Sequence, residues 1–137
     1  MTRILQFISA HMGFLWRGAR FRITGSQTST SFGANALLFV EGERLRLKFV
    51  SDRDQLLLDL QSVDADPSNQ RDWHSAYRVR RLMSGERRES AVLDESDAAF
   101  IERHLDEIEG LFSSEKWPET QERLKALGKV ISNELFG

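Results

Sequence analysis

Three histidines are the side chains best suited to act as bases or metal ligands in this 137-residue chain. His11, His74 and His104 fall in three separate predicted helices, and no two of them have the short helical spacing of a metal clamp. The chain has no cysteine, which excludes thiolate ligands, disulfides and cysteine nucleophiles. The sequence therefore predicts no catalytic residue, no metal site and no cofactor, and we expect a protein that is not an enzyme.

A second group of polar side chains depends on a predicted antiparallel meander over residues 35–61. Three apolar-rich runs are separated there by a turn at Gly42-Glu43 and a four-residue loop over 51–54. In this register Val40 lies opposite Leu45, and Phe49 lies opposite Leu56. The Leu and Phe side chains then share one face. A slip by one residue would place them against charged residues, so the pattern favours this face assignment.

The other face of this meander mixes apolar and charged side chains, which is typical of a protein-binding patch. Two alternatives remain open: cross-strand ion pairs of purely structural value, and cover by the N-terminal helix. Arg20 and Arg22 extend the basic character of this face. The predicted partner-binding residues are Leu37, Phe39, Arg44, Arg46, Lys48, Leu57 and Asp59.

A secondary basic cluster flanks the helix predicted over residues 73–84, and it consists of Arg71, Arg78, Arg80 and Arg81, with Arg87 and Arg88 beyond. Such a cluster can bind phosphates or an acidic protein. The alternative is internal neutralisation by Glu102, Asp106 and Glu109 on the next helix. Binding of nucleic acid or an anionic ligand is thus a second hypothesis, although a pI near 5.9 is low for a nucleic-acid-binding domain.

Length and charge indicate one domain over residues 1–137. The net charge is −2, but residues 1–88 carry +5 and residues 89–137 carry −7. The apolar N-terminus is interrupted by polar residues and is too short to span a bilayer, so we expect no membrane span. Absence of cysteine fits a reducing cytoplasm.

The helices that position these groups follow from apolar spacing. Residues 3–16 predict a helix whose stripe is Ile4, Ile8, Met12 and Leu15. Residues 20–24 predict a half-buried strand with Phe21 and Ile23 inside, and this strand would be the fourth of the sheet. The polar residues after it either form a loop or continue the strand. In the second case Thr28 and Thr30 would lie at the sheet edge. Asp72 is the predicted cap of the 73–84 helix, and Gly85 is its stop.

Two more helices complete the chain. Asp94 begins the first of them, with the stripe Ile101, Leu105, Ile108 and Phe112, and the last helix has the stripe Leu124, Leu127, Ile131 and Leu135. The fold class is α+β: an N-terminal helix, a three- to four-stranded antiparallel meander, and three C-terminal helices packed on one sheet face.

The run FRITGSQTSTSFGANALLFVEGERLRLKFVSDRDQLLLDL, with the terminal ELFG, resembles a recurrent pattern in small uncharacterised bacterial α+β proteins. The Asp52-Arg53 turn belongs to the pattern, whereas Ala34 is an insertion within it. The resemblance implies a compact bacterial domain and no catalytic role. We therefore expect an interaction protein, such as an adaptor or an immunity-type inhibitor of a toxin, that binds another protein; a homodimer through the N-terminal helix or an edge strand is compatible with this.

Overall fold

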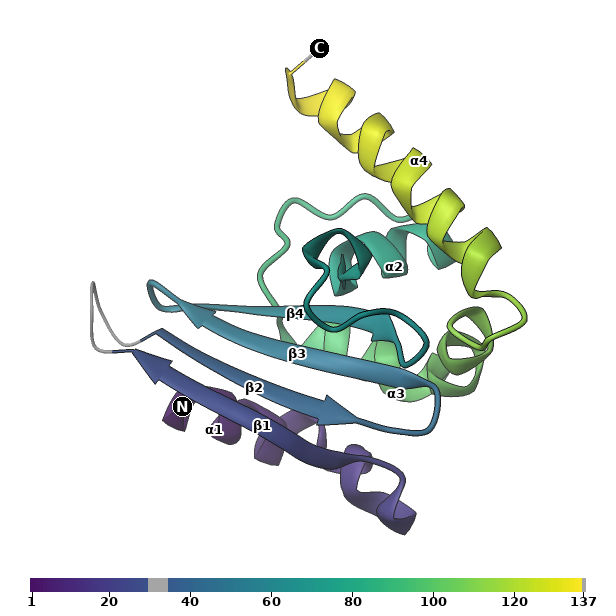
Figure 1. Cartoon of the computed structure of the whole chain (residues 1–137). Helices are drawn as coiled ribbons and strands as arrows, with labels where there is room; N and C mark the ends of the chain where they lie inside the picture. Colours follow the sequence, from purple (N-terminus) through teal and green to yellow (C-terminus); the bar gives the residue numbers. More distant parts are fainter. Residues whose placement is uncertain (30–34, 137) are drawn as a thin grey trace.

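The computed structural model describes residues 1–29 and 35–136, and the side chains of all of these except Phe136. Thr30, Ala34 and Gly137, named above, lie outside the described residues. In chain order the elements are α1 (Thr2–His11), the 3-10 helix η1 (Gly13–Ala19), β1 (Arg22–Ser29), β2 (Asn35–Glu41), β3 (Leu45–Asp52), β4 (Gln55–Ser62), η2 (Gln70–Asp72), β5 (His74–Ser75), α2 (Ala76–Ser84), α3 (Glu95–Leu111) and α4 (Trp117–Phe136) (Figure 1).

The strands form one antiparallel sheet in the order β1-β2-β3-β4-β5. The α+β class is confirmed, and the predicted meander of three to four strands gains a fifth, because the two residues of β5 pair with β4. A strand of two residues leaves too little periodic pattern to be found in the sequence.

Both hairpins pair two residues away from the predicted register. Val40 lies opposite Leu47, and Phe49 lies opposite Leu58. The turns are shifted accordingly: the Gly42 N–H donates to the Leu45 carbonyl at 2.9 Å, and the second turn has Asp52 paired with Gln55. An offset of two keeps every side chain on its own face, so the hydrophobic pattern does not distinguish the two registers.

The second of these turns, Arg53-Asp54, holds both residues in the left-handed conformation, with φ of 49° and 67°. That conformation costs a residue with a Cβ about 1–2 kcal/mol, and glycine avoids the cost. We therefore expect Asp54→Gly to raise the free energy of unfolding by about 1 kcal/mol, measured by urea denaturation. Gly85 ends α2 with a φ of 73°, so Gly85→Ala is the opposite control and should be destabilising. A loss of stability in Asp54→Gly would contradict the left-handed conformation of Asp54 in this turn.

One face of the sheet, the core face, contains the hydrophobic core. Its strand residues are Ala36, Leu38, Val40, Leu45, Leu47, Phe49, Leu58 and Leu60, all buried. α1 and α3 lie together behind this face in Figure 1 and contribute to the same core cluster. The predicted stripes of the N-terminal helix and of the helix after Asp94 are confirmed, since all of their residues are buried.

The N-terminal region differs from the prediction in two ways. The helix expected over 3–16 ends at His11, because Met12 leaves the helical conformation and a 3-10 helix follows. β1 continues to Ser29, which is the longer of the two predicted alternatives. Of the two residues predicted to be inside, Phe21 is buried (6% exposed), whereas Ile23 is 50% exposed. The reason is that β1 forms the border of the sheet, where little packs against it.

α2 begins three residues later than predicted. Because His74 and Ser75 pair with β4, Trp73 is not helical, and Ser75 caps α2 by accepting a bond from the Arg78 N–H at 3.1 Å. Asp72, the predicted cap, instead accepts a hydrogen bond from Gln121. Gly85 ends the helix as predicted.

The three C-terminal helices do not all pack on one sheet face. α3 lies on the core face, whereas α4 packs chiefly on α2 and extends away from the sheet (Figure 1). The predicted buried stripe of α4 is therefore right only in its first half. Leu124 is fully buried, but Leu135 is 70% exposed. The last turn of α4 is held to α2 by ion pairs from Arg81 and Arg87 to Glu134, not by burial of Leu135.

Candidate functional site

The face opposite the core face, here the second face, carries three rows of side chains from β2, β3 and β4. The first row is Glu41, Arg46 and Gln61; the second is Phe39, Lys48 and Asp59; the third is Leu37, Val50 and Leu57. The structure thus brings together six of the seven predicted partner-binding residues.

The seventh, Arg44, does not belong to this face. It lies exposed in the β2–β3 turn, because the register is offset by two residues. Because of the same offset, the prediction missed Val50 as a residue of this row. Val50 takes the place between Leu37 and Leu57 that the prediction assigned to Lys48. The apolar character of the third row would have been visible in the sequence only if the turn residues had been identified correctly.

The connection over residues 63–73, and not the N-terminal helix, covers the first two rows. The Ala65 carbonyl accepts from Arg46 at 2.7 Å, and the Asp66 carbonyl accepts from Gln61 at 2.9 Å. At its end the Trp73 ring lies 6.3 Å from the Phe39 ring, and the Lys48 ammonium lies 4.7 Å from the Trp73 ring centre. These contacts fasten the connection to the sheet by both polar and aromatic groups.

The charged side chains of the second face are matched within the molecule. Arg46 Nε lies 2.6 Å from Glu41 Oε1, and Lys48 Nζ lies 3.7 Å from Asp59 Oδ2. Burial raises the pKa of Asp59, and the neighbouring Lys48 and Arg78 oppose that rise. Little net charge is left on these two rows to attract an ionic ligand.

The third row, Leu37, Val50 and Leu57, is here called the apolar row. Its members are half-buried, and no charged residue stands between them. A surface hollow reaches the row, and Gln27, Leu37 and Val50 contribute to its lining. Within the part of the chain that the structure describes, none of the contacts of the 63–73 connection given above reaches this row. The second face is therefore closed at one end and open and apolar at the other.

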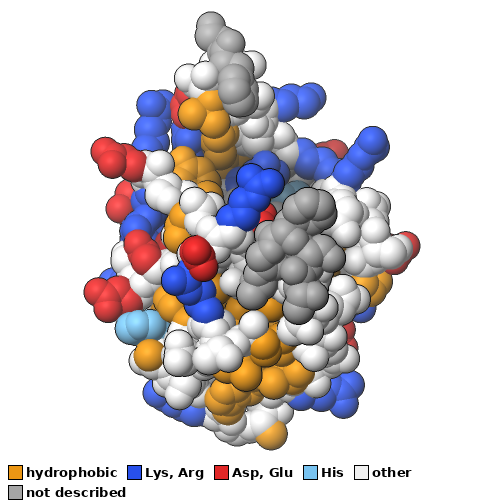
Figure 2. Space-filling model, turned by 90° about the vertical axis from the view of Figure 1, so that its left-hand side faces the viewer, with side chains coloured by type: hydrophobic (Ala, Val, Ile, Leu, Met, Phe, Trp, Pro, Cys, Tyr) orange, Lys and Arg blue, Asp and Glu red, His pale blue; other side chains and the backbone are white. Residues whose placement is uncertain are grey.

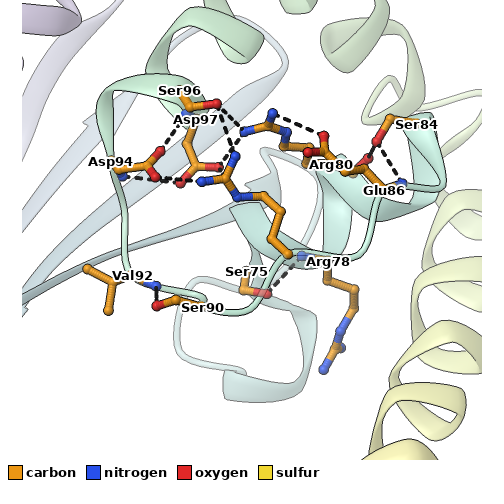
Figure 3. Close-up of polar contacts among 11 residues, drawn as sticks. Ser75, Arg78, Arg80, Ser84, Glu86, Ser90, Val92, Asp94, Ser96 and Asp97 are labelled. Carbon is orange, nitrogen blue, oxygen red and sulfur yellow. Dashed lines mark hydrogen bonds and ion pairs between the residues drawn. The ribbon is translucent and has the colours of Figure 1, made fainter.

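The predicted basic cluster is divided among separate carboxylates. Arg80 lies 3.0 Å from Asp97 and 3.1 Å from Glu86, and Figure 3 shows its guanidinium between them. Arg88 lies 2.5 Å from Asp94. Asp94 and Asp97 also form the capping box of α3, so these arginines bind the first turn of that helix. Burial raises the pKa of Asp97, and the hydrogen bond from Arg80 opposes the rise.

Two further arginines bind α4. Arg81 holds Glu134 through two bonds of 3.0 and 2.7 Å, and Arg87 reaches the same carboxylate at 2.7 Å. The internal neutralisation that the sequence suggested is thus found, but with other partners than Glu102, Asp106 and Glu109. Those three residues pair instead with Arg17 and Arg20, because the side of α3 that carries them faces the N-terminal segment.

Arg71 and Arg78 are the remaining members of the cluster. Among the described residues, no ion pair within 4.0 Å joins either of them to a carboxylate. Arg78 packs its guanidinium on Gly128 of α4, whereas Arg71 is exposed on η2. The four arginines therefore point to different neighbours and do not form one anion site.

The three histidines lie on different elements. His74, in β5, is buried beside the Trp117 ring at 5.7 Å, His104 contacts Glu107 at 3.1 Å, and His11 is exposed at the end of α1. In the ranges 1–29 and 35–136 no group of three or more His, Asp or Glu side chains is arranged to hold a metal ion.

The fold and the site together define a small α+β domain whose antiparallel sheet is buried on one face and partly open on the other. Comparison of the chain with protein-family models, with curated proteins and with solved structures finds no match in any of the three. None of the described helices is both long and apolar enough to cross a membrane.

Proposed function

We propose that this chain is a non-enzymatic interaction domain that binds another protein through the open end of its second face, as an adaptor or an immunity-type inhibitor does. The observation that carries the proposal is the apolar row, which is partly exposed and lies outside the contacts that fasten the 63–73 connection to the other two rows. Exposed apolar groups ringed by polar ones are characteristic of protein-binding patches. We place the domain in the cytoplasm, where a chain without cysteine needs no disulfides.

The roles of the predicted residues follow from their contacts. Leu37 and Leu57 are the proposed anchors, with Val50 between them. Phe39 supports them from the next row, and Lys48 and Asp59 form the polar border. Arg46 is assigned to the scaffold, because its guanidinium already binds Glu41, Gln61 and the Ala65 carbonyl.

Binding of nucleic acid through the arginines is the less favoured function. A phosphate approaching Arg80, Arg81 or Arg88 would have to displace a carboxylate that is already bound. The proposal also contains no catalytic step, since the histidines lie apart on three elements and are not placed to act together.

The double variant Leu37→Gln with Leu57→Gln tests the proposal. We expect it to weaken partner binding by about tenfold or more, since truncation of central anchors of an interface costs roughly 2 kcal/mol. Proteins that co-purify with the wild-type chain from its source cells are quantified by mass spectrometry, and titration calorimetry with the purified partner then gives the two dissociation constants.

The matched control is Val130→Gln with Leu135→Gln, which changes two exposed apolar residues on the distal part of α4. Circular dichroism and thermal unfolding verify that both variants remain folded. A partner that binds the second-face variant as tightly as the wild type, or that only the α4 variant loses, would place the binding surface elsewhere.

A further inference from the structure

The two edges of the sheet differ in whether another segment covers them. At the β4 border the edge is covered: β5 pairs with β4, and the Leu93 N–H donates to the Leu56 carbonyl at 2.7 Å. At the other border β1 is the last strand in the order, and in the described part of the chain no strand pairs with its outer side (Figure 1). The outer backbone donors and acceptors of the stretch from Gly25 to Thr28 are therefore available to a further strand.

Beyond its first residues, β1 has few of the features that usually protect an edge strand. It contains no lysine and no proline, and its one charged residue, Arg22, stands at its first position. The single irregularity of its ladder lies between Ile23 and Gly25, and the register with β2 is regular from Gly25 onward. The stretch from Gly25 to Thr28 is therefore an extended, uncharged edge that is regularly paired with β2 on its inner side.

Exposed apolar side chains occur on the two elements at this border. Ile23 of β1 is 50% exposed, and Leu5 of α1 is 45% exposed. Figure 2 views the side of the molecule on which α1 begins and β1 ends, and apolar side chains gather in its lower part. Ile23 is the second residue of β1 and lies toward the other end of the strand. A strand added to β1 would bring apolar surface of its own against this patch.

We propose that a second copy of this chain pairs with β1, antiparallel and across a two-fold axis, so that two five-stranded sheets join into one. The strand is complementary to itself: antiparallel pairing brings the uncharged stretch from Gly25 to Thr28 against its own copy and keeps the two Arg22 side chains at opposite ends. Leu5 and Ile23 are exposed on the two elements of this border, and an added strand would remove part of this apolar surface from water.

Single cysteines test the geometry of this pairing, since the chain has none of its own. Facing Cα atoms of antiparallel strands are about 4.5–5.5 Å apart, within the range that a disulfide spans. Cysteine is placed singly at Ser26, Gln27 and Thr28, and at Gln55 of β4 as the control. Mild oxidation should yield a disulfide-linked dimer for at least one of the β1 variants and none for Gln55→Cys. No enrichment of dimer in any β1 variant over the control would overturn the proposal.

Mass measurements test the association of the unmodified chain. Light scattering and sedimentation equilibrium should show a concentration-dependent rise from 15.8 kDa to twice that mass. Ser26→Lys with Gln27→Lys brings like charges together across the axis, and should raise the dimer dissociation constant by about tenfold or more, whereas Gln55→Lys should not. A wild-type chain that stays monomeric at every concentration would overturn the proposal, and so would a dimer that the β1 lysines leave unchanged.

Discussion

Replacement of Trp73 by alanine lowers the free energy of unfolding by about 3 kcal/mol, which is the usual cost of removing a buried tryptophan. Trp73 is only 8% exposed, packs against Phe39, lies under the Lys48 ammonium, and donates its ring N–H to the Pro67 carbonyl at 2.9 Å. The side chain is thus the main fastening of the 63–73 connection to the second face. Equilibrium denaturation in urea measures the change.

Two comparison variants make this expectation specific. Trp16 is 39% exposed on η1, so Trp16→Ala should cost less than about 1 kcal/mol. Trp73→Phe keeps the aromatic packing and loses the bond to Pro67, which should cost about 1 kcal/mol. Hydrogen exchange over residues 63–73 should accelerate in Trp73→Ala alone. Equal losses for the alanine variants at Trp73 and Trp16 would show that this ring does not hold the connection in place.

The second large effect is a loss of folding stability at low pH, which His74 causes. Burial lowers the pKa of His74 from its ordinary value of 6.5 to about 4, and the positive charges of Arg78 and Lys125 act in the same direction, against the weaker influence of Asp72. The ring lies against Trp117, and neither of its nitrogens has a hydrogen-bond partner among the described residues. The folded protein therefore holds this imidazole neutral.

Whether the free energy of unfolding rises or falls with pH depends on which state, folded or unfolded, binds the proton. Between the unfolded pKa of 6.5 and the folded pKa of about 4, the unfolded chain binds the proton and the folded chain does not. The free energy of unfolding therefore falls as the pH drops through this window, by up to about 3 kcal/mol from His74, and His74 causes no further loss below it.

His74→Phe isolates this contribution, because phenylalanine keeps an aromatic ring beside Trp117 without a titrating group. Its free energy of unfolding should fall less between pH 7 and pH 4 than that of the wild type, by up to about 3 kcal/mol. Asp59, Asp97 and Glu109, whose pKa values burial raises, act in the opposite direction but equally in both proteins. The exposed His11 provides the control, His11→Gln. Identical pH dependence in the wild type and His74→Phe would contradict a neutral, buried His74.

Much of the candidate site followed from the alternation of the strands. Period-two patterning placed Leu37, Phe39 and Leu57 on the face opposite Leu38 and Phe49, and the structure has them there. The order of the rows could not be derived in the same way. Moving one strand by two residues leaves the pattern unchanged, and the choice then depends on turn conformations that carry no strong sequence signal here, such as a left-handed Arg53-Asp54.

The partners of the arginines could not be derived either. Arg81 binds Glu134 across 53 residues of sequence, and this pairing exists only because α4 packs along α2. Carboxylates occur throughout the chain, and a single ion pair contributes too little energy to leave a recognisable spacing. The arginines that form one basic cluster in the sequence therefore bind two different helices in the fold, α3 and α4.

The amino-acid sequence by itself determined the α+β class, the two faces of the meander, and helix ends such as the start at Asp94 and the stop at Gly85. These depend on local periodicity and on short-range hydrogen bonds, which neighbouring residues specify. The tertiary structure alone decided the hairpin registers, the cover that the 63–73 connection gives to the second face, and the exposure of the apolar row. Each of these depends on which distant surfaces pack together, and hydrophobic burial, which drives that packing, is not directional.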